Sequence, residues 1–149
     1  MSAPFTLRPY LASDEDAVIE LWFRTWQQAY PAIDFAQRMD AWRMRWRDEL
    51  APTARIVVAE QASRTIGFVT VDATGYLDQL VVDPDQWGSD LGNALIAQAK
   101  VISPRGITLL VNTDNARAIR FYTRNGFQHT HDDVNPVSGR PVYGMAWTP

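Results

Sequence analysis

The stretch that decides the fold runs from Leu77 to Leu95 and reads LDQLVVDPDQWGSDLGNAL. Its apolar start predicts a strand over Tyr76–Val82, closed by Asp83-Pro84, and apolar residues at helical spacing predict a helix over Leu91–Ile102. The backbone N–H groups at such a helix start are unpaired and lie at the positive end of the helix dipole, so they suit a phosphate or pyrophosphate. An ordinary strand-to-helix loop, with Gly88 for geometry, is the competing interpretation.

A second informative stretch runs from Asn112 to Phe127 and reads NTDNARAIRFYTRNGF. It follows the apolar run Ile107–Val111, which predicts a strand buried on both faces, as in a parallel pairing. Asn115 is placed to cap a helix that runs to about Arg124 and stops at Asn125-Gly126. Taken alone, a tyrosine in this helix is more often a packed residue than a catalyst.

The flanking segments complete a mixed sheet. Toward the N-terminus, Ser13 and Asp16 form a predicted capping box for a helix that Pro31 ends, and a second helix is predicted over Asp34–Leu50. Alternating and apolar runs predict further strands at residues 5–8, 56–59, 66–71, from 127 onward and at 141–147. The pattern predicts an α/β (α+β) fold, with a mixed, mostly antiparallel sheet of about six or seven strands and helices on both faces.

Composition bounds the function classes. The chain has 149 residues, 46% of them hydrophobic, which predicts a single domain over residues 1–149 and excludes a disordered chain. No cysteine is present, which excludes a disulfide framework, a thiolate zinc site and a cysteine nucleophile. A formal net charge of −3 argues against nucleic acid or an anionic membrane as a partner. The basic stretch between Arg38 and Arg47 is interleaved with acids, which is typical of a solvated helix face. The N-terminus shows no secretory signal, so a cytoplasmic protein is expected.

Together, the two stretches resemble the GNAT superfamily of acetyl-CoA-dependent N-acetyltransferases, over almost the whole chain. The run Leu77–Pro84 with the glycine turn looks like the family's acetyl-CoA motif. Residues Asn115–Phe127 are similar to its second motif, Asn-x-x-Ala-x-x-x-Tyr-x-x-x-Gly-Phe. The tail Gly139–Trp147 fits the family's closing hairpin, and residues Arg8–Trp22 its opening strand and helix.

The resemblance implies a site and a reaction. Acetyl-CoA is the implied acyl donor, an amine attacks its thioester directly, and Tyr122 protonates the departing CoA thiolate. Pantetheine is expected between the strands Tyr76–Val82 and Ile107–Val111, which splay apart in this family. The residues implied in donor binding are the main chain of Leu80, Val81 and Val82, the N–H groups of Gly88, Ser89, Asp90, Leu91, Gly92 and Asn93, and Asn115. No metal is implied.

The resemblance does not specify the general base or the amine that accepts the acetyl group. Asp78 shares one face of the predicted strand with Tyr76 and Leu80, so it is the candidate general base. An Asp satisfied by a cross-strand partner, or proton relay through water, are the alternatives. Trp22, Trp26 and Tyr30 recur every four residues and are candidates for the acceptor pocket, the alternative being core packing. The acceptor is expected to be a small-molecule or peptide amine.

A rival reading gives the chain a different class of function. Asp90 stands where the family pattern has its middle glycine, and Trp87 stands at the motif's first position. A carboxylate beside a pyrophosphate favours a non-catalytic acyl-CoA sensor or interaction module, whereas the pair Asn115 and Tyr122 favours the enzyme. A nucleotide-binding module is disfavoured, since no Lys or Ser/Thr follows the turn in the phosphate-binding pattern. The sequence leaves a homodimer open.

Overall fold

The computed structural model describes residues 4–149, so residues 1–3 of the predicted domain lie outside the described residues. Seven strands within this range form two sheets, in the orders β1-β2-β3-β4 and β5-β7-β6. Their bounds are β1 Thr6–Pro9, β2 Ala54–Gln61, β3 Arg64–Asp72, β4 Leu77–Val82, β5 Ile107–Asn112, β6 Gln128–Val134 and β7 Pro141–Trp147. All paired strands are antiparallel, and a single parallel bridge between Tyr76 and Thr108 joins the two sheets. The predicted fold class is confirmed.

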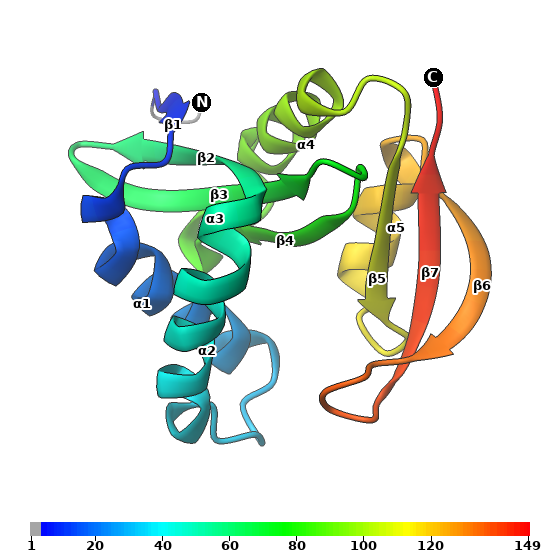
Figure 1. Cartoon of the computed structure of the whole chain (residues 1–149), viewed down its shortest axis with the longest axis horizontal. Coiled ribbons are helices and arrows are strands. Elements are labelled where there is room, and N and C mark those ends of the chain that lie inside the picture. The colour runs from blue at the N-terminus through cyan, green and yellow to red at the C-terminus, as the bar shows by residue number, and fades with distance from the viewer. Residues whose placement is uncertain (1–3) are drawn as a thin grey trace.

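Helices cover both faces of the first sheet (Figure 1). The α-helices are α1 Glu15–Ala29, α2 Met39–Arg45, α3 Ala51–Thr53, α4 Leu91–Ile102 and α5 Ala116–Arg124. The bounds of α4 are those predicted. The helix predicted over Asp34–Leu50 is divided instead into a 3-10 turn at Ala36–Arg38, α2 and a π-helical turn at Trp46–Leu50. No helix among residues 4–149 is long and apolar enough to cross a bilayer.

The entry to α1 differs from the predicted capping box. The carboxylate of Asp14, rather than the side chains of Ser13 and Asp16, accepts the N–H of Leu11 at 2.8 Å. The same carboxylate takes two hydrogen bonds from the guanidinium of Arg8, at 2.7 and 2.8 Å. Asp14 is buried, and an ionised group leaves water only when it is paired in this way. The predicted capping box was wrong because Asp14, held by Arg8 of β1, caps the preceding 3-10 turn at Leu11 in place of the pair Ser13 and Asp16.

Two cores lie on opposite sides of the first sheet. One packs α1 and the helical turns around α2 against β2 and β3, with Trp22, Trp46 and Phe68 among its buried side chains. The other packs α4 and α5 against the sheet and includes Leu95 and Tyr122. At the ends of α4 and α5, the amine of Lys100 donates to the carbonyl of Asn125 at 2.7 Å and lies 4.9 Å from the ring centroid of Trp147.

The strand β5 departs from its prediction. Its burial alternates along the chain, with Ile107, Leu109 and Val111 buried and Thr108 exposed, so one face alone is fully buried. It pairs antiparallel with β7, and it meets the segment before β4 at the Tyr76–Thr108 bridge. Beyond that bridge the two sheets separate, and β4 and β5 run at an angle to each other (Figure 1). The predicted splay between these strands is therefore present, although the predicted parallel pairing is limited to one bridge.

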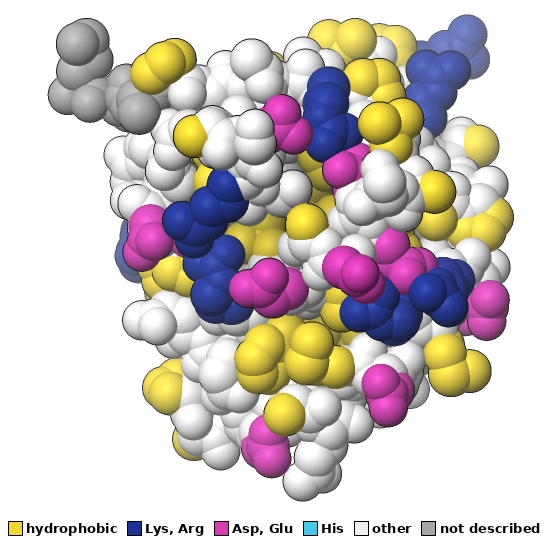
Figure 2. Space-filling model, turned by 90° about the vertical axis from the view of Figure 1, so that its left-hand side faces the viewer, with side chains coloured by type: hydrophobic (Ala, Val, Ile, Leu, Met, Phe, Trp, Pro, Cys, Tyr) yellow, Lys and Arg dark blue, Asp and Glu magenta, His cyan; other side chains and the backbone are white. Residues whose placement is uncertain are grey.

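Arginines near α2 are more than a solvated face. Arg43 and Arg47 both form ion pairs with Glu15 of α1, at 3.0 and 2.6 Å. Arg45 pairs with Asp78 of β4 at 2.5 Å. Basic and acidic side chains are interspersed, rather than gathered by sign, on the side of the molecule shown in Figure 2. These pairs attach α2 to α1 and to the sheet.

Candidate active site

The exposed edge of β4 is the first component of the site. The N–H of Asp83 donates to the carbonyl of Ile66 at 2.8 Å, so the preceding pair, Val82 and Gly67, is a non-hydrogen-bonded pair of the β3–β4 ladder. The N–H and C=O of Val82 therefore point away from β3, and those of Leu80 do so by the same alternation. Val81 instead pairs with Phe68 of β3. Of the predicted main-chain contacts, Leu80 and Val82 face the space between the sheets, and Val81 does not.

A β-bulge in β4 changes which side chains share a face. Val71 pairs with Leu77 and Val69 with Leu80, so Asp78 and Gln79 together lie opposite Thr70. The hydroxyl of Thr70 accepts the N–H of Gln79 at 3.1 Å, which satisfies the bulged backbone. Leu80 consequently packs in the α4–α5 core, while Asp78 contacts α2. The predicted common face of Tyr76, Asp78 and Leu80 was wrong at Leu80, because a bulge adds a residue to the alternation.

The turn before α4 offers free amides. Asp83 is 1% exposed, begins the turn by accepting the N–H of Asp85, and pairs with Arg24 and Arg64 at 3.0 Å each. Within the predicted phosphate-binding segment, the N–H of Ser89 donates to Gln86 and the N–H of Leu91 to the Ser89 hydroxyl. The remaining amides have no partner among the described residues; they belong to Gly88, Asp90, Gly92 and Asn93. Four free N–H groups at the start of a twelve-residue helix fit an anionic phosphate group.

Gly88 and Gly92 are each suited to their position for a different structural reason. Gly88 has φ +85°, a conformation that glycine adopts without strain. At Gly92 a Cβ would lie 3.0 Å from the ring of Phe121, so this glycine allows α4 to approach α5 closely. Asp90, by contrast, has φ −76° and needs no glycine for its backbone. Its side chain is exposed and makes no capping hydrogen bond.

Trp87 closes the turn against β4. Its indole N–H donates to the carbonyl of Val82 at 2.9 Å, so one of the outward-facing groups on the edge of β4 already has a partner. The guanidinium of Arg117, at the start of α5, lies 3.6 Å from the Trp87 ring centroid. The sequence pattern marked Trp87 as a departure, and the structure shows that it connects β4, the turn and α5.

Asn115 and Tyr122 lie on one helix with different surroundings. The amide oxygen of Asn115 accepts the N–H of Ala118 at 3.2 Å, which confirms the predicted cap and leaves its NH₂ group unpaired among the described residues. Tyr122 is 8% exposed and packs against the rings of Phe121 and Phe127. Its hydroxyl has no hydrogen-bond partner in residues 4–149. Burial raises the pKa of Tyr122 well above its usual value, so the phenol is neutral.

Asp78 is held by an arginine. Both of its carboxylate oxygens accept hydrogen bonds from Arg45, at 3.0 and 2.5 Å, and the amide of Gln79 donates to one of them at 3.0 Å. The partner thus comes from α2 rather than from a neighbouring strand. The bidentate pair fixes the Asp78 carboxylate against Arg45, so both of its oxygens are already engaged.

The three residues predicted to line the acceptor pocket, Trp22, Trp26 and Tyr30, differ in burial. Trp22 is 2% exposed and stacks on Trp42 at 4.6 Å, so it belongs to the core. Trp26 is half-buried between Tyr30 and Trp42. The Tyr30 hydroxyl donates to Asp114 at 3.0 Å and accepts from Asn112 at 3.1 Å. Arg140 from the loop before β7 pairs with the same Asp114 at 2.7 Å, so this network joins α1 to the β5 end of the second sheet.

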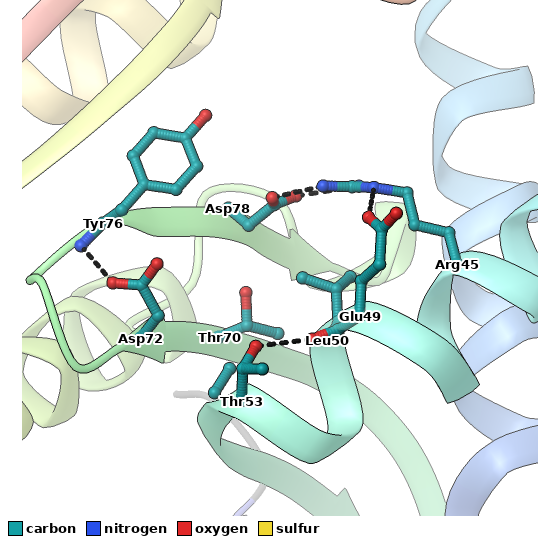
Figure 3. A pocket seen from close by; sticks show the side chains of 9 residues that line it. Arg45, Glu49, Leu50, Thr53, Thr70, Asp72, Tyr76 and Asp78 are labelled. Atoms are coloured by element: carbon teal, nitrogen blue, oxygen red, sulfur yellow. Dashed lines mark hydrogen bonds and ion pairs between the residues drawn. The ribbon is translucent and has the colours of Figure 1, made fainter.

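A cavity of about 130 Å³ lies beside the β4 bulge, on the α2 side of the sheet. Figure 3 shows Asp72 and Thr70 at its base, Asp78 and Arg45 along one side, and Tyr76 rising from the start of β4 at its rim. From the sequence pattern, Tyr76 stands out only as a neighbour of Asp78, and Arg45 only as part of a basic stretch. Arg45 and Asp78 pair across 33 residues, so the pair leaves no local signal in the sequence. No group of three or more His, Asp or Glu side chains suited to a metal is present in residues 4–149.

Comparisons with known proteins agree with this arrangement. The family model for the acetyltransferase (GNAT) domain matches residues 52–129. The peptidyl-lysine N-acetyltransferase YjaB of Salmonella typhimurium is 28% identical over 127 residues, which cover 85% of both chains. The mycothiol acetyltransferase of Kineococcus radiotolerans is 29% identical over 93% of this chain, which spans 48% of that protein.

Solved structures share the fold. The PaiA N-acetyltransferase of Thermoplasma acidophilum, crystallised in complex with coenzyme A, superposes with a TM-score of 0.79 at 19% identity, covering 99% of this chain and 100% of that one. The predicted family, enzyme class and fold are thus confirmed. Because the family model matches more than half of the chain, this protein belongs to the GNAT family of acetyltransferases.

Proposed function

We propose that residues 1–149 act as one domain that transfers an acetyl group from acetyl-CoA to a primary amine by direct attack. The observation that carries the proposal is the set of unpaired polar groups around the separated strands β4 and β5. It consists of the outward-facing backbone of Leu80, the free amides of the turn before α4, and the Tyr122 hydroxyl. A site for a thioester with a phosphate-bearing arm needs these three kinds of group.

The donor fits the residues present. The free N–H groups of Gly88, Asp90, Gly92 and Asn93 suit the pyrophosphate of CoA, and the NH₂ of Asn115 suits the amide-containing arm. Leu80 presents the backbone N–H that would polarise the acetyl carbonyl. Val82 offers its N–H, since its carbonyl is bound by Trp87.

Tyr122 is the proposed general acid. When the amine nitrogen forms its bond to the carbonyl carbon and the carbon–sulfur bond breaks, the leaving sulfur carries a negative charge. A neutral phenol with no competing partner can donate its proton to that sulfur and regain one from water. The amine's own proton leaves to water. Asp78 is the second candidate for this proton, but both of its carboxylate oxygens are bound by Arg45.

The acceptor class rests on relatives. YjaB is named for peptidyl lysine, and other relatives are named for mycothiol. We favour a primary alkylamine such as a lysine side chain. A cytoplasmic location and a homodimer remain predictions of the sequence alone.

The test is thiol release from acetyl-CoA with a panel of amines, run on the wild type and on Tyr122→Phe. Loss of a positioned general acid typically lowers kcat by about 10²- to 10⁴-fold. We expect Tyr122→Phe to show that loss while its affinity for CoA, measured by calorimetry, stays unchanged. Unchanged kcat would remove Tyr122 from the mechanism. CoA binding without turnover on any amine would favour the rival function, an acyl-CoA sensor.

A further inference from the structure

Tyr76 occupies the point where the two sheets meet. Its backbone bridges Thr108 of β5, and the carbonyl of Gly75 accepts the Thr108 N–H at 3.0 Å. Its side chain borders the cavity beside the β4 bulge (Figure 3). Beyond this point β4 and β5 separate, so Tyr76 both lines the cavity and lies at the start of the space where we place the thioester.

The other polar side chains that line the cavity already have partners. Arg45 binds Asp78 and Glu49, and the hydroxyl of Thr53 donates to the Glu49 carbonyl. Asp72 accepts the N–H groups of Thr74 and Tyr76, and Thr70 accepts that of Gln79. Tyr76 is the one polar lining residue whose side chain makes no hydrogen bond to any residue in 4–149. A half-buried hydroxyl without a partner is a group available to a ligand.

The hydroxyl of Tyr76 is uncharged under the conditions of the reaction. Burial raises the pKa of Tyr76 itself, and the neighbouring Asp78 adds to the effect, so its phenol is neutral in the pH range of the reaction. A neutral phenol both accepts and donates hydrogen bonds.

We propose that this cavity receives the acceptor and that the Tyr76 hydroxyl accepts a hydrogen bond from the attacking amine, orienting its lone pair toward the acetyl carbonyl. This inference rests on the proposed acetyl transfer. The bond that forms is between amine nitrogen and carbonyl carbon, the bond that breaks joins that carbon to sulfur, and Tyr76 neither gains nor loses a proton.

The size of the cavity sets the class of acceptor. Sites for drug-sized ligands occupy roughly 300–1,000 Å³, and this cavity has about 130 Å³. It therefore accommodates the end of a primary alkylamine, such as a lysine side chain, rather than a whole drug-sized molecule. We expect n-butylamine and the side chain of Nα-acetyl-lysine amide to act as acceptors.

The experiment compares Tyr76→Phe with wild type in steady-state thiol release, using Nα-acetyl-lysine amide. Losing one hydrogen bond corresponds to roughly a five- to tenfold effect. We expect kcat/KM for the amine to fall by that factor, through the KM for the amine, with the KM for acetyl-CoA unchanged. Tyr143→Phe is the matched control, because Tyr143 is also half-buried but lies on β7 against His129, away from the cavity. The Tyr143→Phe variant should leave kcat/KM for the amine, the KM for the amine and the KM for acetyl-CoA unchanged.

Two kinetic outcomes overturn the inference: an unchanged KM for the amine in Tyr76→Phe, or an equal rise in KM for both substrates. A merely structural role would lower the melting temperature and affect both substrates together. If the wild type turns over no amine, the inference is tested by binding alone. Calorimetry then measures the affinity of n-butylamine for the CoA-saturated wild type and for CoA-saturated Tyr76→Phe. Binding that weakens in Tyr76→Phe supports the inference even though the proposed function has failed, and absent or unaltered binding overturns it.

Discussion

The guanidinium of Arg117 lies 3.6 Å from the ring centroid of Trp87, whose indole N–H in turn binds the carbonyl of Val82. The contact connects the N-terminal end of α5 to the turn that precedes α4. Arg117 has no carboxylate partner among the described residues, and its ring partner Trp87 directly precedes Gly88, the first of the amides that we assign to the pyrophosphate. Its positive charge is therefore available to the phosphates of the donor.

Replacing Arg117 by Ala should weaken CoA binding. A guanidinium that interacts with a phosphate at an exposed site contributes about 1 kcal/mol, which corresponds to roughly fivefold in affinity. Lys should restore little, because its ammonium cannot stack as a plane. Calorimetry of CoA binding checks this, with Arg120→Ala as the control, since Arg120 is exposed on the same helix. Equal losses in the two variants would show a general charge effect instead.

Asp90 provides a second test of the turn. Its φ of −76° means that substitution changes charge without relieving backbone strain. We expect Asp90→Asn to bind CoA several-fold more tightly, since about 1 kcal/mol of repulsion from the pyrophosphate is removed. The gain should shrink as salt rises, and Asp90→Gly should give no more than Asn does. Both variants binding like the parent, at low salt, would place the Asp90 carboxylate away from the phosphates.

The pH dependence of kcat follows from the burial of Tyr122. Burial raises the pKa of this phenol above its usual value of about 10, so the acid form persists throughout neutral and moderately alkaline solution. With both substrates saturating, kcat should not decline between about pH 7 and about pH 10. A stopped-flow or plate assay of thiol release gives the profile. An alkaline decline that is absent from Tyr122→Phe would assign a lower pKa to Tyr122 and contradict this expectation.

Acid stability depends on the Arg8–Asp14 pair. The hydrogen bonds from Arg8 lower the pKa of Asp14 in the folded state, against an opposing effect of burial. The pair therefore contributes stability above the unfolded pKa of about 3.9, and this contribution is lost as pH falls through the folded pKa. Asp14→Asn should lower the free energy of unfolding at neutral pH by about 2 kcal/mol, and by less in acid.

Urea unfolding at several pH values measures the effect. Asp16→Asn is the control: that side chain is 91% exposed, so its pair with Arg43 should contribute less than about 1 kcal/mol. A difference between Asp14→Asn and wild type that stays constant below about pH 4 would show that the carboxylate's charge is not what stabilises the entry to α1.

Features coded by neighbouring residues were predictable from the sequence. The bounds of α4 and the Asn115 cap depend on local spacing, and both were found as predicted. The β4 bulge was not predicted, since it depends on how Thr70 of another strand accommodates Asp78 and Gln79. A strict period of two assumes that each residue of β4 lies opposite one residue of β3. It therefore placed Leu80 on the wrong face of the sheet.

The site was predictable in its backbone and less so in its side chains. The turn amides follow from a strand, a glycine turn and a helix, which the sequence displays. The pairing of Arg45 with Asp78 and the network of Tyr30 with Asp114 join residues 33 and 84 positions apart. Such contacts depend on how helices cross the sheet, and no local pattern encodes them. Tyr76 became a candidate only when its neighbours proved to be occupied.

Lys100 is the single lysine of the chain, and its amine is bound to the Asn125 carbonyl beside Trp147. An ε-amine must present a free lone pair to be acylated, and this one would first have to leave both contacts. The chain therefore offers acetyl donors no readily acylated ε-amine of its own, so self-modification on lysine should not compete with the acceptor for acetyl-CoA.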